Sequence, residues 1–157
     1  MRGRSFTPKH RLELEERYQD PGVTKLINKI MRGGKKATAT KIVYTALESL
    51  AKKRGTEAPV LLRQAMEKAS PILEVRSRRV GGASYQVPME VRPNRKVILV
   101  MRWLLTAARG AKGIPMARAL ENELENIFND TGSVLKHRED LHKMAEANRA
   151  FAHFARY

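Results

Sequence analysis

The chain has 157 residues, with 31 lysines and arginines against 16 aspartates and glutamates, a formal net charge of +15 at neutral pH. It has no cysteine, which excludes disulfides, thiolate catalysis and cysteine-based zinc sites. No apolar run approaches the roughly 18 residues of a membrane span, so no membrane partner is expected. The excess charge predicts a polyanionic partner, because a basic surface gathers phosphates and releases their counterions.

The first residues form no clean apolar face. Residues 1–19 are therefore interpreted as a flexible basic arm, whose Arg2, Arg4 and Lys9 could lie along a phosphate backbone and become ordered on binding. A frayed terminus with no role is the alternative. Residues 20–157 are expected to form a single helical domain, because no linker or composition break divides them.

Three helices are predicted next. The first begins at Asp20, which can cap free N–H groups and is followed by a proline suited to a first turn, and the glycines at 33–34 end it. The second runs from Lys35 to Gly55, with apolar residues at steps of three and four. The third is closed by Pro71.

A stretch at about residues 72–91 carries the β signal. Two runs alternate apolar and polar residues, the period of a strand with one face on a core, and Gly81-Gly82 between them can turn the chain. Pro88 lacks an N–H and is expected at an outward-facing edge position. A lone hairpin is marginal in water, so this one must lean on helices or on a partner. The residues expected on the core face are Leu73, Val75, Ser77, Tyr85, Val87, Met89 and Val91.

Three further helices follow the hairpin. Pro93 and Pro115 mark the starts of the fourth and fifth, and Ser133 is expected to cap the sixth. Trp103 falls beside the apolar stripe of the fourth helix and is interpreted as packing. The fifth carries an acidic outer face, expected to point away from nucleic acid: Glu121, Glu123 and Glu125. The predicted fold is mainly α, a six-helix bundle with a projecting two-stranded β-hairpin arm between helices 3 and 4.

No catalytic or metal-binding constellation is found in the sequence. His137 and His142 are five residues apart and off a common helical face, whereas a helical metal pair needs a spacing of four. The run Gly33-Gly34-Lys35-Lys36 lacks the spacing and the preceding strand of a P-loop. The chain is therefore not expected to be an enzyme, and no cofactor or metal is expected.

Several separate basic elements favour nucleic-acid binding. Lys35 and Lys36 lie at a helix N-terminus, where the helix dipole alone would not place cations. Basic elements that must converge on one surface suit folded RNA, which is read by its shape. An mRNA repressor, a general DNA-coating protein and, least favoured, a basic enzyme acting on RNA stay open as alternatives. The other candidate residues are Arg76, Arg78, Arg79, Arg92, Arg95, Lys136, Arg138, Lys143 and Arg149.

Two long motifs and two shorter ones resemble the small-subunit ribosomal protein seven family, of the bacterial and organellar type. The long ones are residues 75–93 (VRSRRVGGASYQVPMEVRP) and residues 144–153 (MAEANRAFAH). The shorter ones are GKK at 34–36 with KIVY at 41–44, and RWL at 102–104 with AAR at 107–109.

This resemblance implies a six-helix fold with a hairpin arm that binds the 3′ major domain of small-subunit ribosomal RNA early and nucleates assembly of the subunit head. It implies that the arm and the C-terminal helix lie near the exit-site tRNA and the mRNA exit path, and that the C-terminal segment approaches ribosomal protein eleven on the platform. A ribosome in a bacterial cytoplasm is the default location, with a mitochondrion or plastid as alternatives.

The family pattern also suggests roles by position. Lys35, Lys36 and the arginines at 76, 78, 79, 92 and 95 would contact ribosomal RNA. The end of the hairpin facing the tRNA would consist of Gly81, Gly82, Ala83 and Tyr85.

Overall fold

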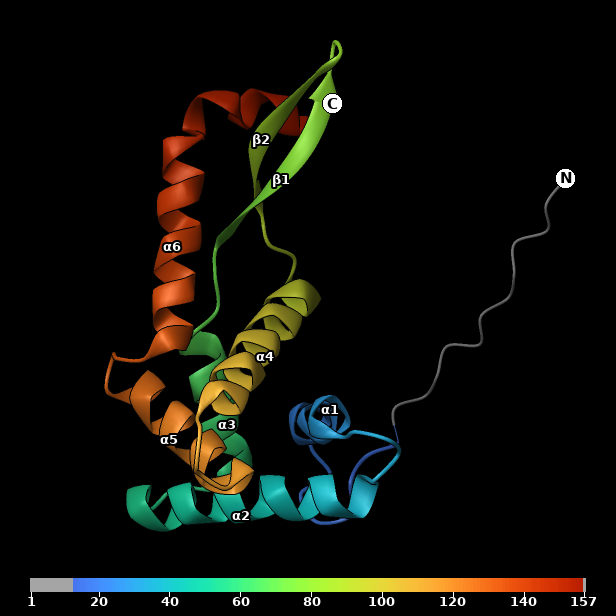
Figure 1. Ribbon diagram of the computed structural model, residues 1–157, viewed down its shortest axis with the longest axis vertical. Coiled ribbons are helices and arrows are strands. Elements are labelled where there is room, and N and C mark those ends of the chain that lie inside the picture. The colour runs from blue at the N-terminus through green and yellow to red at the C-terminus, as the bar shows by residue number, and fades with distance from the viewer. Residues whose placement is uncertain (1–12, 157) are drawn as a thin grey trace, which may run out of the picture.

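The computed structural model describes residues 13–156, so Arg2, Arg4 and Lys9 of the predicted arm lie outside the described residues. The described chain is mainly helical, with one hairpin between the third and fourth helices as predicted (Figure 1). The elements are α1 (Pro21–Ile30), α2 (Lys36–Arg54), α3 (Ala58–Lys68), β1 (Leu73–Val80), β2 (Ala83–Glu90), α4 (Pro93–Gly110), α5 (Met116–Phe128), α6 (Ser133–Ala147) and the 3-10 helix η1 (Arg149–Arg156).

Local signals account for most helix ends. Asp20 Oδ1 accepts the N–H groups of Gly22 at 2.7 Å and Val23 at 3.0 Å, which confirms the predicted cap of α1. Gly55 ends α2 with a φ of 65°, a conformation that glycine adopts without a Cβ clash. The predicted cap at Ser133 is wrong, because Gly132 is the capping residue of α6 and Ser133 is already helical.

The core is formed where the apolar stripes of α1 to α5 meet the start of α6. Burying each large aliphatic side chain contributes about 1.5–3 kcal/mol, so this core outweighs any single surface contact. Trp103 packs against it at the edge, with its ring centroid 6.1 Å from that of His137, and its predicted packing role is confirmed. Fully buried side chains include Leu26, Ile27, Leu47, Leu50, Leu62, Met101, Leu104, Leu120, Leu124 and Ile127.

The hairpin register differs from the prediction. Gly81 and Gly82, with φ of 58° and 89°, form a two-residue turn that places Val80 opposite Ala83. This turn pairs odd-numbered residues of one strand with even-numbered residues of the other, so Val75 lies opposite Pro88 and Arg76 lies opposite Val87. Since cross-strand partners share a face, the two predicted apolar runs lie on opposite faces, and the prediction of a single core face is wrong.

Both faces of the hairpin base are covered. Val87 and Pro88 point to opposite faces and both are buried, so the outward-facing position predicted for Pro88 is wrong. In Figure 1, α6 runs alongside the hairpin and η1 turns back across β2. The hairpin thus leans on the C-terminal helices.

The acidic face predicted for α5 is only partly on the surface. Glu121 is buried, with Oε1 2.8 Å from Lys53 Nζ and Oε2 3.3 Å from Arg118 Nη1. Because α5 packs against α2, the Glu121 carboxylate lies between the two helices and pairs with Lys53 of α2. An outer position is therefore wrong for Glu121, while Glu123 and Glu125 are half-buried.

Candidate nucleic-acid interface

A buried glutamate organises the base of the hairpin arm. Glu74 is 5% exposed and accepts from Arg76 Nε at 2.7 Å and from Arg95 Nε at 3.2 Å. A carboxylate this buried needs such partners, and a guanidinium with five N–H donors keeps others for a second partner. The structure thus brings Arg76 and Arg95 together, half-exposed, at the junction of β1 and α4. Sequence reasoning assigned Glu74 to the solvent side and missed this role.

The rest of the arm presents basic and small residues toward its tip. Arg79 is exposed beside the turn, Arg78 is half-buried, and Gly81, Gly82 and Ala83 are exposed. Arg92 is exposed at the N-cap of α4. These positions agree with an arm that offers cations and an open backbone to a partner.

Tyr85 does not stand free on the arm. Its ring centroid lies 5.3 Å from that of Phe151 and 5.0 Å from that of Phe154, both on η1. Aromatic pairs at these separations contribute about 0.5–1.5 kcal/mol beyond the area they bury. Tyr85 therefore joins β2 to the C-terminal segment, and no signal near it in the sequence reveals this partnership.

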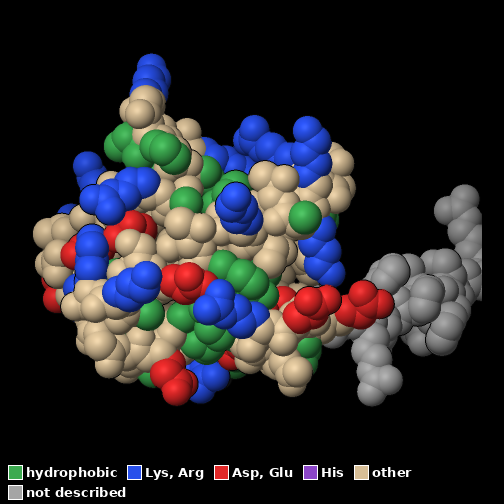
Figure 2. Space-filling view, turned by 90° about the horizontal axis from the view of Figure 1, so that it is seen from below, with side chains coloured by type: hydrophobic (Ala, Val, Ile, Leu, Met, Phe, Trp, Pro, Cys, Tyr) green, Lys and Arg blue, Asp and Glu red, His purple; other side chains and the backbone are tan. Residues whose placement is uncertain are grey.

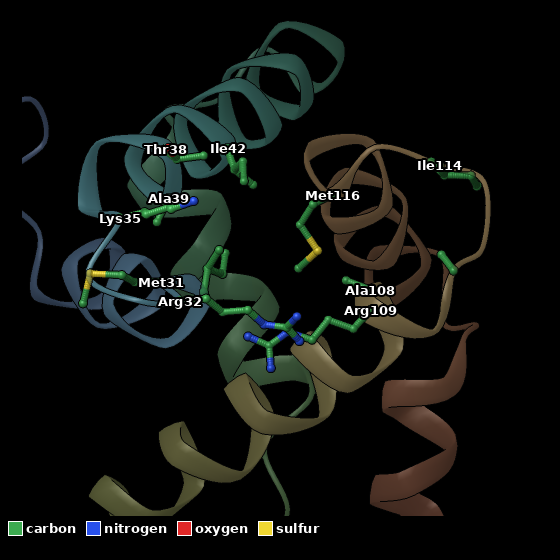
Figure 3. A pocket seen from close by; sticks show the side chains of 12 residues that line it. Met31, Arg32, Lys35, Thr38, Ala39, Ile42, Ala108, Arg109, Ile114 and Met116 are labelled. Carbon is green, nitrogen blue, oxygen red and sulfur yellow. The ribbon is translucent and has the colours of Figure 1, made fainter.

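A cavity of about 390 Å³, here called the arginine cavity, is lined by cations from distant segments. It is lined by Arg32 and Lys35 from the α1–α2 connection and by Arg109 from the end of α4. Figure 3 shows the guanidinium groups of Arg32 and Arg109 pointing toward one another. Arg109 Nη2 also donates to the Lys29 carbonyl at 3.3 Å. No acidic side chain of the described chain lines this cavity, so the like charges favour an anion between them.

The rest of the cavity lining is largely apolar. Met31, Ile42 and Met116 are among the lining residues, and Figure 3 shows Met116 extending from α5 into the space. Sequence reasoning selected Lys35 but missed Arg32 and Arg109, because residues 77 positions apart share no local pattern.

The two predicted lysines at the start of α2 have different surroundings. Lys35 lies with the cations of the arginine cavity, whereas Lys36 lines a second cavity together with Glu13, Glu16 and Glu48. Nearby carboxylates lower the local positive potential. Lys35 is therefore the better placed of the two for a phosphate.

The basic residues predicted on the C-terminal helices are also in different environments. Arg138 Nη1 donates to the Lys68 carbonyl at 2.5 Å, and Arg149 Nη1 lies 3.4 Å from Glu146 Oε1. Lys136 and Lys143 are exposed on α6. Lys143 lines a groove of about 690 Å³ with Lys68 and Lys96, two cations that sequence reasoning missed.

The α2 end of the molecule has a mixed surface. Figure 2 looks at this end, and acidic side chains lie among the lysines and arginines there. Ion pairs account for part of this mixture, including Arg17 with Glu48 and Lys53 with Glu125 at 3.0 Å. Mutually neutralised charges attract a polyanion weakly, so the hairpin and the arginine cavity are the stronger candidates.

Membrane-spanning and metal-binding features are absent from residues 13–156. No described helix combines the length and apolar character needed to cross a bilayer. The described side chains include no group of three or more potential metal ligands.

Basic elements gathered on a helical core with a projecting arm are typical of a structural protein that contacts a polyanion. The sequence matches the family model described as Ribosomal protein S7p/S5e over residues 2–149. The chain belongs to this family, is a structural constituent of the small ribosomal subunit and is not an enzyme, as predicted.

Similar chains named small ribosomal subunit protein uS7 occur in several bacteria. The chain from Thermosipho melanesiensis is 57% identical over 137 residues, covering 87% of this chain and 88% of the relative. That from Rhodococcus erythropolis is 52% identical over 147 residues, 94% of both chains. That from Thermodesulfovibrio yellowstonii is 50% identical over 151 residues, 96% of this chain and 97% of the relative.

Proposed function

We propose that the chain binds the 3′ major domain of small-subunit ribosomal RNA directly and early, and that this binding nucleates assembly of the subunit head. The observation that carries the proposal is the convergence of Arg32, Lys35 and Arg109 on one cavity whose lining is otherwise largely apolar. Cations brought together without a described carboxylate are stabilised by a phosphate, which folded RNA supplies at fixed positions.

The cavity suits one unpaired nucleotide of such an RNA. Its phosphate would lie between the guanidinium groups of Arg32 and Arg109, with Lys35 at the side. Its base would contact the apolar lining around Met116. Unpaired nucleotides whose bases leave the stack are the usual targets of specific RNA recognition.

The arm extends this interface in the proposal. Arg79 and the exposed turn at Gly81-Gly82 lie near the exit-site tRNA and the mRNA exit path, while Arg76, Arg92 and Arg95 contact ribosomal RNA at the base. The C-terminal segment approaches ribosomal protein eleven. Residues 20–157 act as one RNA-binding domain, and Arg2, Arg4 and Lys9 ahead of it add further contacts.

The test is a salt titration of binding to a fragment of the 3′ major domain, against an unrelated structured RNA of equal length. The expected result is a preference of about a hundredfold or more, equivalent to about 2.8 kcal/mol. Equal binding to both RNAs, disappearing together as salt rises, would show that charge alone is acting. Comparable affinity for duplex DNA would favour a general nucleic-acid binder instead.

A further inference from the structure

The C-terminal helices contact the hairpin arm at two separate levels. The first is the hinge where α3 leads into β1. The backbone N–H of Ile72 donates to His142 Nε2 at 3.0 Å, and Arg138 Nη1 donates to the carbonyl of Lys68 at 2.5 Å. Two side chains one turn apart on α6 thus hold both ends of the segment that enters the hairpin.

The second level lies further out along the arm. There η1 packs on β2, and its Phe151 and Phe154 contact the ring of Tyr85. Figure 1 shows α6 rising beside the hairpin and η1 crossing to it. The whole segment 133–156, here called the strap, therefore holds the arm at its hinge and at its middle.

The arm needs such support. An isolated two-stranded hairpin is marginal in water, and β1 and β2 pair only with each other within the described chain. Near the hinge, the arm is also anchored by the Glu74–Arg95 pair and by the Val91 N–H, which donates to the Ile72 carbonyl at 3.0 Å. These anchors act at the base together with the two α6 side chains, and the Tyr85 contact adds a second level that limits movement of the tip.

We propose that the strap sets the direction of the hairpin arm, with Arg138 and His142 as positioning residues for the arginines that the arm presents. The aromatic contact of Tyr85 with η1 holds the middle of the arm, and the two α6 side chains hold its hinge. This role of the strap is separate from the proposed RNA contacts, because it concerns the arm before any partner binds.

The hinge contact requires an acceptor at position 142. Nε2 of His142 accepts the hydrogen bond from the Ile72 N–H. An alanine at this position removes the acceptor, whereas the amide oxygen of a glutamine can supply one.

The cysteine-free chain allows a direct test of arm mobility. Spin labels on Ser84→Cys in the arm and Thr45→Cys on α2, both exposed positions, report the distance distribution between them by double electron–electron resonance. The full-length chain is expected to give one narrow peak. The pair Phe151→Ala/Phe154→Ala, and separately His142→Ala, should lose that peak while circular dichroism shows unchanged helix content.

Rescue by a conservative variant gives a readout that a general loss of packing would not give. His142→Gln keeps an acceptor near the position of Nε2, so its peak should stay narrow whereas that of His142→Ala broadens. His137→Gln, on the same helix but stacked on Trp103, is the matched control and should behave like the parent.

The same variants separate this inference from the proposed function. Strap variants keep every arm arginine, so RNA affinity should fall by about tenfold with an unchanged slope of log affinity against log salt. The mobility measurement needs no RNA and stands if RNA binding fails. A narrow peak retained in both His142→Ala and the double phenylalanine variant would overturn the proposal.

Discussion

The carboxylate of Glu74 on β1 and the guanidinium of Arg95 on α4 meet with an Nε to Oε2 separation of 3.2 Å. Arg76 shares the same carboxylate from within β1. This contact fixes the base of the arm to the helical core and at the same time orients two half-exposed arginines. The proposed RNA contacts of Arg76 and Arg95 would therefore couple RNA binding to stability at this point.

Replacing Glu74 with Ala should lower the free energy of unfolding by about 1–2 kcal/mol, because two guanidinium groups lose a buried partner. Urea denaturation followed by circular dichroism measures this change. Glu90→Ala is the matched control, since Glu90 ends the opposite strand and is exposed, and it should stay within about 0.5 kcal/mol of the parent. Equal destabilisation in both variants would contradict the role given to Glu74.

Replacing Arg79 and replacing Arg76 should have different effects on RNA binding and on stability. Arg79→Ala removes an exposed cation, so the slope of log affinity against log salt should flatten by roughly 0.7–0.9 for each phosphate that the protein no longer neutralises, with stability unchanged. Arg76→Ala should flatten the slope and also destabilise the chain, because Glu74 loses one partner. RNA titrations at several salt concentrations, with parallel urea melts, distinguish the two. An unchanged slope for Arg79→Ala would count against its contact with phosphate.

Replacing an arginine of the arginine cavity should have opposite effects on the stability of the free protein and on its affinity for RNA. Arg32→Gln removes one of two facing guanidinium groups, so the free chain should be equally or slightly more stable. RNA binding should nevertheless weaken, by about 1.5–3 kcal/mol for one charged hydrogen bond. Thermal melts and RNA titrations measure the two effects. Lys52→Gln, an exposed cation in the last turn of α2, is the control and should affect RNA binding far less.

Glu121 should make the chain acid-sensitive. Burial raises its pKa, but the Lys53 ammonium and the Ser49 hydroxyl more than offset this, and the pKa lies below its usual value. A lowered pKa in the folded state means that the stabilisation is present above the unfolded value near 4.3 and is lost as pH falls through the folded value. Glu121→Gln should therefore cost about 1–2 kcal/mol at neutral pH and progressively less below pH about 4.

Glu123, on the same helix, is the control for this prediction, because its pKa is shifted in the opposite direction. Burial raises its pKa, partly offset by the Ser133 hydroxyl, so its ionised form opposes folding at neutral pH. Glu123→Gln should be neutral or stabilising at pH 7, and the advantage should vanish as pH falls. Urea melts from pH 7 to pH 3 on both variants provide the comparison. Parallel pH profiles would contradict both assignments.

Tyr44 should titrate unusually late. Burial and its hydrogen bond to Glu15 raise the pKa of Tyr44 to about 12. Its neutral form thus contributes stability that is complete below the unfolded value near 10 and is lost as pH rises toward 12. Ultraviolet absorbance should show a late tyrosinate step that Tyr44→Phe removes. A late step that persists in Tyr44→Phe would assign it to another tyrosine.

Much of this architecture follows from local chemistry. Asp20 begins a helix because its side chain satisfies free N–H groups, and Gly55 ends one because it adopts a positive φ. The hairpin follows from alternation on either side of Gly81-Gly82. These effects act over a few residues, which is why the order of helices and strands was correctly predicted.

The strand register was needed to decide which face of the hairpin each residue lies on. Alternation identifies two apolar runs but does not say whether they share a side. The two-residue turn pairs odd with even positions, and the runs are placed on opposite faces. Pro88 is buried, although its missing N–H alone suggested an outward position.

By itself, the sequence determined the order of the helices, the hairpin arm, the positive charge and, through its long motifs, the family. Only the tertiary structure decided which residues meet: Arg32 with Arg109, Glu74 with Arg95, and Tyr85 with η1. Propensity and capping depend on neighbours along the chain, whereas these contacts depend on how whole faces pack. Their partners are separated by enough chain that no spacing rule connects them.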